Sequence, residues 1–100
     1  MTHKSLTFGL DFDDTFTACP ELWVSFIRQA QIAGHRVIVV TCRRNTAESR
    51  LEIREFMERH GCDVQFVCTD MGSKCWAMNH RGIHVDIWID DEPNTVMNGR

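Results

Sequence analysis

Short apolar runs alternate along the chain with longer segments in which apolar residues recur every three or four positions. The runs are rich in β-branched and aromatic residues, which is typical of buried strands, and they cover residues 6–10, 36–41, 63–68 and 84–89. Helical spacing fills the intervals between them and predicts helices over 20–33, 45–60 and 73–80. Pro20 suits a first helical turn, and Gly34 and Gly61 follow two of the helices as stop signals.

This alternation of strands and helices predicts an α/β fold. Strands separated by single helices form a parallel sheet with right-handed crossovers and helices on both faces, here a Rossmann-like three-layer domain. We expect the strand order 4-1-2-3, which places the first strand beside the fourth. No repeat, linker or low-complexity tract divides the chain, so residues 1–100 are predicted to form one domain.

Composition and charge narrow the range of functions. The chain is 43% hydrophobic and 25% charged, as globular proteins are, and its net charge of −3 does not favour nucleic acid as a partner. No segment approaches the roughly 18 apolar residues of a membrane span, and residues 1–10 lack the apolar core of a signal peptide. We therefore expect a cytoplasmic protein with no membrane partner.

The cysteines and tryptophans are interpreted as structural residues. Five cysteines without a Cys-x-x-Cys pair argue against a disulfide framework and suit small buried positions in a reducing compartment. A zinc site built from Cys68, Cys75, His80 and His84 matches no standard spacing. The tryptophans occupy apolar positions of predicted elements and are expected in the core, at Trp23, Trp76 and Trp88.

Polar clusters follow the predicted strands or precede a helix. Ligands of open parallel sheets bind outside the carboxyl ends of the strands, so these clusters are candidate site residues. With the expected strand order, the carboxylates of Asp11, Asp13, Asp90 and Asp91 would converge, and a divalent cation would relieve their repulsion. Mg²⁺ suits such a set because it prefers hard oxygen ligands. The clusters are Asp11-Phe12-Asp13-Asp14-Thr15, Thr41-Cys42-Arg43-Arg44, Ser73-Lys74 and Asp90-Asp91.

The remaining polar residues of these clusters suit a phosphate group. The Thr41 hydroxyl, the Lys74 ammonium and the Arg43 guanidinium could neutralise and orient phosphate oxygens. Taken singly, each has a simpler explanation: acidic turns often cap helices, and an isolated lysine is usually solvated. The hypothesis of a phosphoryl site depends on all of them lying together.

The order of these residues resembles the four motifs of the haloacid dehalogenase-like hydrolase superfamily. The matching segments are Asp11-x-Asp13-x-Thr15 after an apolar strand, Val-Ile-Val-Val-Thr41, Lys74 and Ile-Trp-Ile-Asp90-Asp91, which together span nearly the whole chain. The resemblance implies that Asp11 is a nucleophile forming an aspartyl-phosphate and that Asp13 is the general acid and base. It implies that Thr41 and Lys74 hold the phosphoryl group. It also implies that Mg²⁺ is bound by Asp11, the carbonyl of Asp13, Asp90 and Asp91.

The resemblance also bears on the type of reaction and on the substrate. An acid at position 13 is similar to the phosphatases of the superfamily, whereas many members have Gly where this chain has Asp14. No room exists for a cap domain after Asp11 or between Thr41 and Lys74. The resemblance therefore implies a capless magnesium-dependent phosphatase, with an open site for a phosphorylated substrate that could be macromolecular, or with a lid supplied by a second copy.

Two alternatives remain open from the sequence. A phospho-accepting signalling module of receiver type also combines acidic residues, a hydroxyl, a lysine and Mg²⁺, but its acceptor aspartate follows the third strand, where this chain has Asp70. A metal-binding relative without turnover would carry the same residues as an enzyme.

Overall fold

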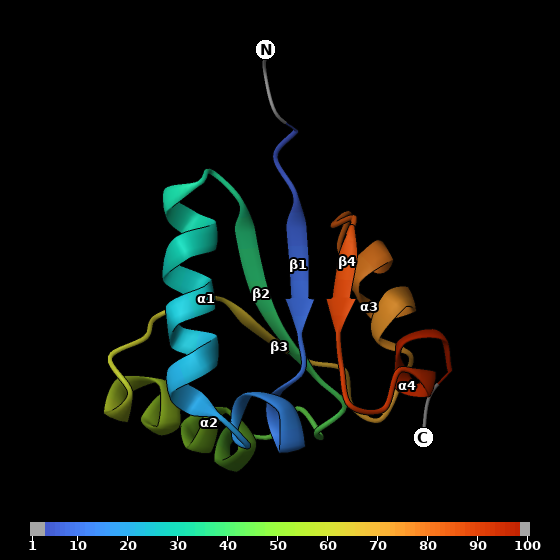
Figure 1. Ribbon diagram of the computed structural model, residues 1–100. Coiled ribbons are helices and arrows are strands. Elements are labelled where there is room, and N and C mark those ends of the chain that lie inside the picture. Colours follow the sequence, from blue (N-terminus) through green and yellow to red (C-terminus); the bar gives the residue numbers. More distant parts are fainter. Residues whose placement is uncertain (1–3, 99–100) are drawn as a thin grey trace.

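The computed structural model describes residues 4–98 of the chain. Four strands, four α-helices and one π-helical turn alternate along it (Figure 1). The strands are β1 (Thr7–Leu10), β2 (Arg36–Thr41), β3 (Phe66–Cys68) and β4 (Ile87–Ile89). The helical elements are η1 (Phe12–Phe16), α1 (Pro20–Ile32), α2 (Ala47–Arg59), α3 (Lys74–His80) and α4 (Asn94–Met97).

The four strands form one parallel sheet in the order β3-β2-β1-β4, which confirms the expected topology. In its register Leu10 of β1 lies beside Val39 of β2 and Ile89 of β4. Thr41, at the end of β2, pairs with Cys68 at the end of β3. The carboxyl ends of all four strands therefore meet at one edge of the sheet, where η1 and the segment before α4 also lie (Figure 1).

Helices cover both faces of the sheet, as the continuous apolar run in β2 predicts. Val37 and Val39 belong to a core that includes Ile27 of α1 and Ile53 of α2. The alternate residues of β2 face a second core, which includes Met78 of α3. Burial on both faces is consistent with the place of β2 as one of the two inner strands of a three-layer fold.

A close approach between β1 and β4 depends on Gly9. A Cβ atom at Gly9 would lie 2.7 Å from two ring atoms of Trp88, nearer than side chains pack. The absence of a side chain lets the Trp88 indole lie against the β1 backbone. This contact holds together the two strands that precede Asp11 and Asp90.

Strand β4 is shorter than its apolar run suggests. Asp86 occupies the position before β4, and its carboxylate accepts a hydrogen bond from the Thr7 N–H at 2.8 Å. Its own N–H donates to the Thr7 carbonyl at 2.8 Å. A side chain thus replaces a backbone partner there, and the regular ladder begins one residue later at Ile87.

The start of α2 also differs from the expectation that Asn45 opens the helix. Thr46 is the N-cap, and its hydroxyl accepts from the Ser49 N–H at 3.1 Å. Asn45 instead lies in the loop that leads to the helix, where its amide oxygen accepts from Arg50 at 2.6 Å. The helix therefore begins one residue later than expected, at a neighbouring residue whose side chain can also cap a helix.

Two expectations about buried residues are corrected. Trp76 lies on the surface of α3 with 63% of its area exposed, stacked on His80 one turn later at a ring separation of 4.5 Å. All five cysteines are free; Cys42 and Cys68 are buried, but Cys19 is exposed at the start of α1. An apolar position of a short helix therefore does not always face the sheet.

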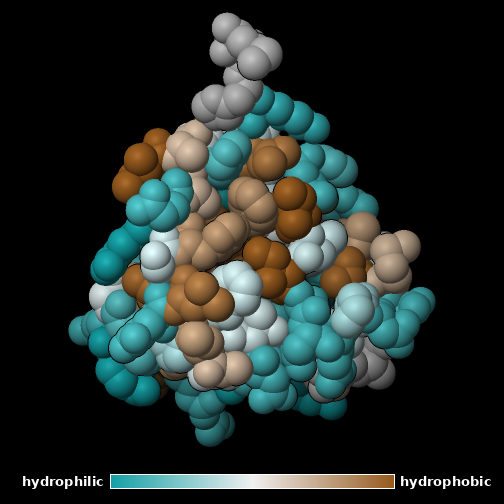
Figure 2. All heavy atoms as spheres, in the orientation of Figure 1, coloured by the Kyte–Doolittle hydropathy of each residue, from teal (hydrophilic) through white to brown (hydrophobic). Residues whose placement is uncertain are grey.

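Apolar side chains gather across the middle of the face shown in Figure 2, between α1 and the edge of the sheet at β4. Exposed large apolar residues on these two elements are Leu22, Ile32 and Ile87. Within residues 4–98, no helix combines the length and apolar character that crossing a membrane requires.

Candidate active site

Asp11 occupies the first position after β1 and is 7% exposed. Its N–H donates to the carbonyl of Ile89 at 2.9 Å, so the β1–β4 pairing continues to this residue. Thr15, one turn later in η1, donates its hydroxyl to Asp11 Oδ2 at 3.0 Å. The rings of Phe12 and Phe16 are buried in the core and hold η1 in place. Thr15 of this element can therefore orient the Asp11 carboxylate.

The backbone after Asp11 separates its side chain from that of Asp13. Asp13 has an extended backbone conformation within η1, and Asp14 has a left-handed one with a φ of 63°. Glycine is favoured in the left-handed region, and aspartate is among the few other residues that tolerate it. Position 14 can therefore hold an aspartate as well as a glycine.

Lys74 begins α3 and places its ammonium in the interior of the site. Its side chain is 2% exposed, and Nζ donates to Asp11 Oδ1 at 2.6 Å and to Asp90 Oδ2. Ser73 caps the helix by accepting from the Trp76 N–H at 3.2 Å. Burial alone would lower the pKa of Lys74, but the two carboxylates outweigh it and raise this pKa above its usual value. The lysine is therefore a buried cation.

Asp11, Asp90 and Asp91 form a cluster of three carboxylates. One ligand atom from each lies within 4.8 Å of the others. Burial, with the neighbouring Asp91 carboxylate, raises the pKa of Asp11 to about 6, while the pKa of Asp91 is lowered, first by its interaction with Asp11. One ammonium among three carboxylates leaves an excess of negative charge that a cation would neutralise.

The donor set of this cluster suits a hard divalent cation. Carboxylate oxygens are the ligands that Mg²⁺ and Ca²⁺ prefer, and two or three protein ligands leave positions for water or a phosphate oxygen. The Thr15 hydroxyl oxygen also lies 3.1 Å from Asp91 Oδ1, so its single proton serves one carboxylate or the other, and it accepts from the Asp91 N–H at 3.2 Å. Among residues 4–98 no other group of three or more His, Cys, Asp or Glu side chains comes together in this way. Cys68, Cys75, His80 and His84, which were considered as zinc ligands, therefore do not form a metal-binding group.

Thr41 is the last residue of β2, and Arg43 lies in the loop that follows it. Thr41 is 1% exposed, and its hydroxyl oxygen accepts from the Arg43 N–H at 3.3 Å. Arg43 forms a bidentate ion pair with Asp13, with Nε and Nη2 each 2.9 Å from a carboxylate oxygen. Its Nη1 donates to Glu52 of α2 at 2.5 Å. The Asp13 carboxylate raises the pKa of Arg43 further above its usual value.

A cavity of about 240 Å³ joins the expected catalytic and phosphate-binding residues. Asp90 and Asp91 border a separate shallow depression, together with Leu22, Trp23 and Ile89. Asp14 lines both, so the turn η1 stands between them. The lining of the cavity is Asp11, Asp13, Asp14, Thr41, Cys42, Arg43, Met71, Lys74 and Glu92.

Sequence reasoning missed two contributors and left one candidate outside the site. Thr15 lies within the first motif but received no role, although it bridges Asp11 and Asp91. Glu52 has no motif, and only the fold brings it to Arg43. Asp70 lies apart from the three-aspartate cluster and does not line the cavity; its carboxylate accepts from the Asn45 N–H at 3.3 Å.

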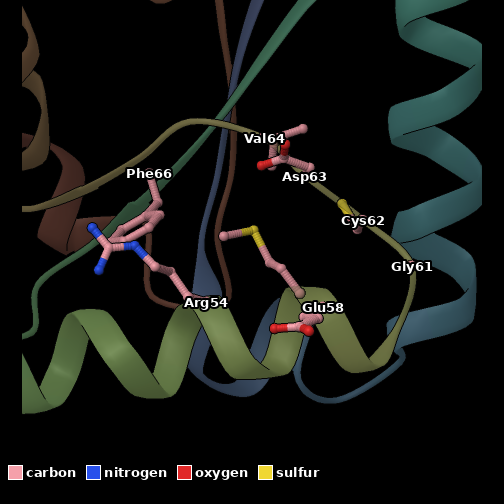
Figure 3. A pocket seen from close by; sticks show the side chains of 8 residues that line it. Arg54, Glu58, Gly61, Cys62, Asp63, Val64 and Phe66 are labelled. Carbon is pink, nitrogen blue, oxygen red and sulfur yellow. The ribbon is translucent and has the colours of Figure 1, made fainter.

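A larger cavity, of about 510 Å³, lies between the second half of α2 and the segment that leads into β3 (Figure 3). The Arg54 guanidinium lies over the Phe66 ring at 5.5 Å, and Met57 and Val64 contribute buried apolar side chains. None of the residues that gather at the strand ends lines it. The larger volume therefore does not mark the site with the clustered carboxylates.

Comparisons with protein-family models, curated proteins and solved structures found no match to this chain. The structure shows a small parallel α/β domain whose strand ends hold a three-aspartate cluster that could bind a metal ion.

Proposed function

We propose that this protein is a magnesium-dependent phosphatase of the haloacid dehalogenase-like type, acting on phosphomonoesters through an aspartyl-phosphate at Asp11. The observation that carries the proposal is the environment of Asp11. Its buried carboxylate is oriented by Lys74 and Thr15, belongs to a cluster suited to a cation, and lines a cavity with Thr41 and Arg43. The groups that we propose as acceptor carboxylate, cation ligands and phosphate-binding residues thus lie at the same end of the sheet.

In the proposed first step, a carboxylate oxygen of Asp11 attacks phosphorus. The new bond joins this oxygen to phosphorus, the bond from phosphorus to the leaving oxygen breaks, and Asp13 gives a proton to that oxygen. In the second step, Asp13 takes a proton from water, the water oxygen bonds to phosphorus, and the bond between phosphorus and the Asp11 oxygen breaks, which frees the Asp11 carboxylate and inorganic phosphate. A pKa of about 6 leaves Asp11 mostly ionised at neutral pH, as a nucleophile must be.

Charge neutralisation at the phosphoryl group falls to the cations of the cavity. The Lys74 ammonium lies 2.6 Å from Asp11 and would offset the charge that collects between nucleophile and phosphate. Mg²⁺ held by Asp11, Asp90 and Asp91, with the Asp13 carbonyl as a further ligand, would supply Lewis-acid polarisation of the phosphoryl oxygens. Thr41 would donate its hydroxyl to the same group.

The dimensions of the cavity limit what it can enclose. At about 240 Å³ it is smaller than the roughly 300–1,000 Å³ typical of sites that enclose a drug-sized ligand. We propose that only the phosphoryl end of the substrate enters, while the leaving group remains at the surface. A phosphorylated macromolecule fits this arrangement, and a second copy of the chain could supply a lid.

The test is hydrolysis of p-nitrophenyl phosphate with and without Mg²⁺. We expect turnover that requires Mg²⁺ and that Asp11→Asn lowers at least a thousandfold, because the covalent intermediate cannot form. Asp63→Asn, which removes an exposed carboxylate outside the site, is the matched control and should retain full activity. A wild-type protein that binds Mg²⁺ but does not turn over any phosphomonoester would instead be a metal-binding relative without activity.

The same preparation distinguishes the receiver-type alternative. Acetyl phosphate would leave a stable phosphoryl group on Asp70 if the chain were a signalling module. Peptide mapping after borohydride reduction identifies the labelled aspartate. We expect label on Asp11 alone, and stable label on Asp70 would replace the phosphatase proposal by the signalling one.

A further inference from the structure

The guanidinium of Arg43 is already held on three sides. Nε and Nη2 donate to the two oxygens of Asp13, each at 2.9 Å, and Nη1 donates to Glu52. The guanidinium carbon also lies 5.3 Å from the centre of the Phe12 ring, so its plane is fixed by an aromatic face. A planar fork with this many partners is an ordered element of the cavity wall.

This arrangement conflicts with the roles of both partners during catalysis. Asp13 accepts hydrogen bonds with both oxygens, and it cannot reach a leaving group while it keeps both. Arg43 offers its bidentate edge to Asp13, the edge that would bind two phosphate oxygens. The pair as seen is therefore a resting arrangement.

We infer that an incoming phosphoryl group displaces Asp13 from Arg43, so that substrate binding itself releases the general acid and base. This inference rests on the proposed function and adds to it a substrate-triggered exchange of ion-pair partners. Phosphate presents two oxygens at the spacing that the guanidinium fork matches, and it carries more negative charge than one carboxylate. Until it arrives, both carboxylate oxygens of Asp13 stay bound to Arg43.

The position of Glu52 explains why Asp13 is the partner that phosphate would displace from Arg43. It lies on α2 and does not line the cavity, whereas Asp13 does. A phosphoryl group in the cavity therefore competes with Asp13 and leaves the Glu52 contact in place. Glu52 and the Phe12 ring act as positioning groups that hold the guanidinium over the cavity while its other edge changes partner.

The experiment measures binding of inorganic phosphate by calorimetry at pH 7.5 with saturating Mg²⁺, and requires no turnover. If Asp13 competes for Arg43, Asp13→Asn should raise phosphate affinity about fivefold, the effect of one partly exposed charge-assisted pair. Asp14→Asn is the matched control: it removes the adjacent charge from the same cavity, tolerates the same left-handed backbone, and should change the affinity less than twofold.

Two further variants separate ion-pair exchange from a general effect of charge. In an Arg43→Gln background, Asp13→Asn should give no gain, because the guanidinium for which Asp13 and phosphate compete is gone. Glu52→Gln removes the other ion pair of the same guanidinium and should not raise the affinity. An equal gain from Asp14→Asn or Glu52→Gln, or a gain that persists without Arg43, would overturn the inference.

Failure of this inference can be told apart from failure of the proposed function. Phosphate that binds the wild type with no gain in Asp13→Asn overturns the exchange while leaving the phosphatase proposal standing. No phosphate binding by the wild type or any variant overturns both.

Discussion

Asp11 and Lys74 form the buried ion pair around which the site is built. Each side chain is less than a tenth exposed, and their charged atoms lie 2.6 Å apart. Buried charges are tolerated when they are paired and hydrogen-bonded, and removing one partner leaves an uncompensated charge. The second carboxylate on Lys74, from Asp90, connects the ends of β1 and β4 through one ammonium group.

The titration of Asp11 should appear in the stability of the metal-free protein. Its pKa rises from 3.8 to about 6 on folding, so its contribution to stability is fully present below pH 3.8 and is lost as the pH rises through 6. Relative to Asp11→Asn, the free energy of unfolding of the wild type should fall as the pH rises from 3.8 to 6, and the difference between the two proteins should be constant at higher pH. Urea denaturation with a chelator present measures it. A difference that is constant from pH 4 to 8 would contradict a raised pKa of the buried Asp11 carboxylate.

The sequence predicted which carboxylates lie together better than it predicted the contacts of individual side chains. A carboxylate at a strand end must lie at the sheet edge, so Asp11, Asp90 and Asp91 could be placed together once the topology was assumed. The pairing of Arg43 with Asp13 could not, because the two residues are 30 positions apart and their contact depends on side-chain orientation. Glu52 reaches Arg43 only because α2 packs beside the β2 loop.

At the scale of elements, the contact between β1 and β4 sets the geometry of the cluster. Asp11 follows β1 and Asp90 follows β4, so their separation depends on how closely the two strands lie. Gly9 permits the Trp88 ring to approach the β1 backbone, where a Cβ atom would be 2.7 Å away. Close packing at this point therefore positions carboxylates two residues farther along.

Gly9→Ala tests that dependence. Overpacking of a fitted core typically costs about 1–3 kcal/mol, which exceeds the gain from replacing a strand glycine. We expect a loss of stability of that size in chemical denaturation, together with weaker Mg²⁺ binding because β4 must shift. Gln29→Ala, on the exposed surface of α1, is the control and should change neither. Unchanged stability in Gly9→Ala would show that the indole moves aside freely.

Element type could be predicted from periodicity, whereas element ends and short elements could not. The apolar runs before Asp11 and through β2 gave clear strands because burial on both faces requires continuous apolar sequence. The turn η1 and the helix α4 lack such periodicity, since each is about one turn long. Trp76 was misplaced because the seven residues of α3 are too few to define a buried side.

At the scale of the whole molecule, sheet order converts distant sequence positions into one site. The order β3-β2-β1-β4 places the first and last strands side by side, so residues eighty positions apart contribute carboxylates within 4.8 Å. The nearby depression adds Leu22, Trp23 and Ile89 to this edge, and in Figure 2 apolar side chains continue over α1 and β4. A partner or lid would find apolar surface beside the proposed active site.

Calorimetric titration of Mg²⁺ into the wild type, Asp90→Asn, Asp91→Asn and the control Asp63→Asn tests the central claim most directly. The account predicts one Mg²⁺ per chain in the wild type and the control, with affinity lowered about tenfold or more in each cluster variant, because each removes a charged ligand. Mg²⁺ binding that is absent from the wild type, or equally tight in all four proteins, would contradict it.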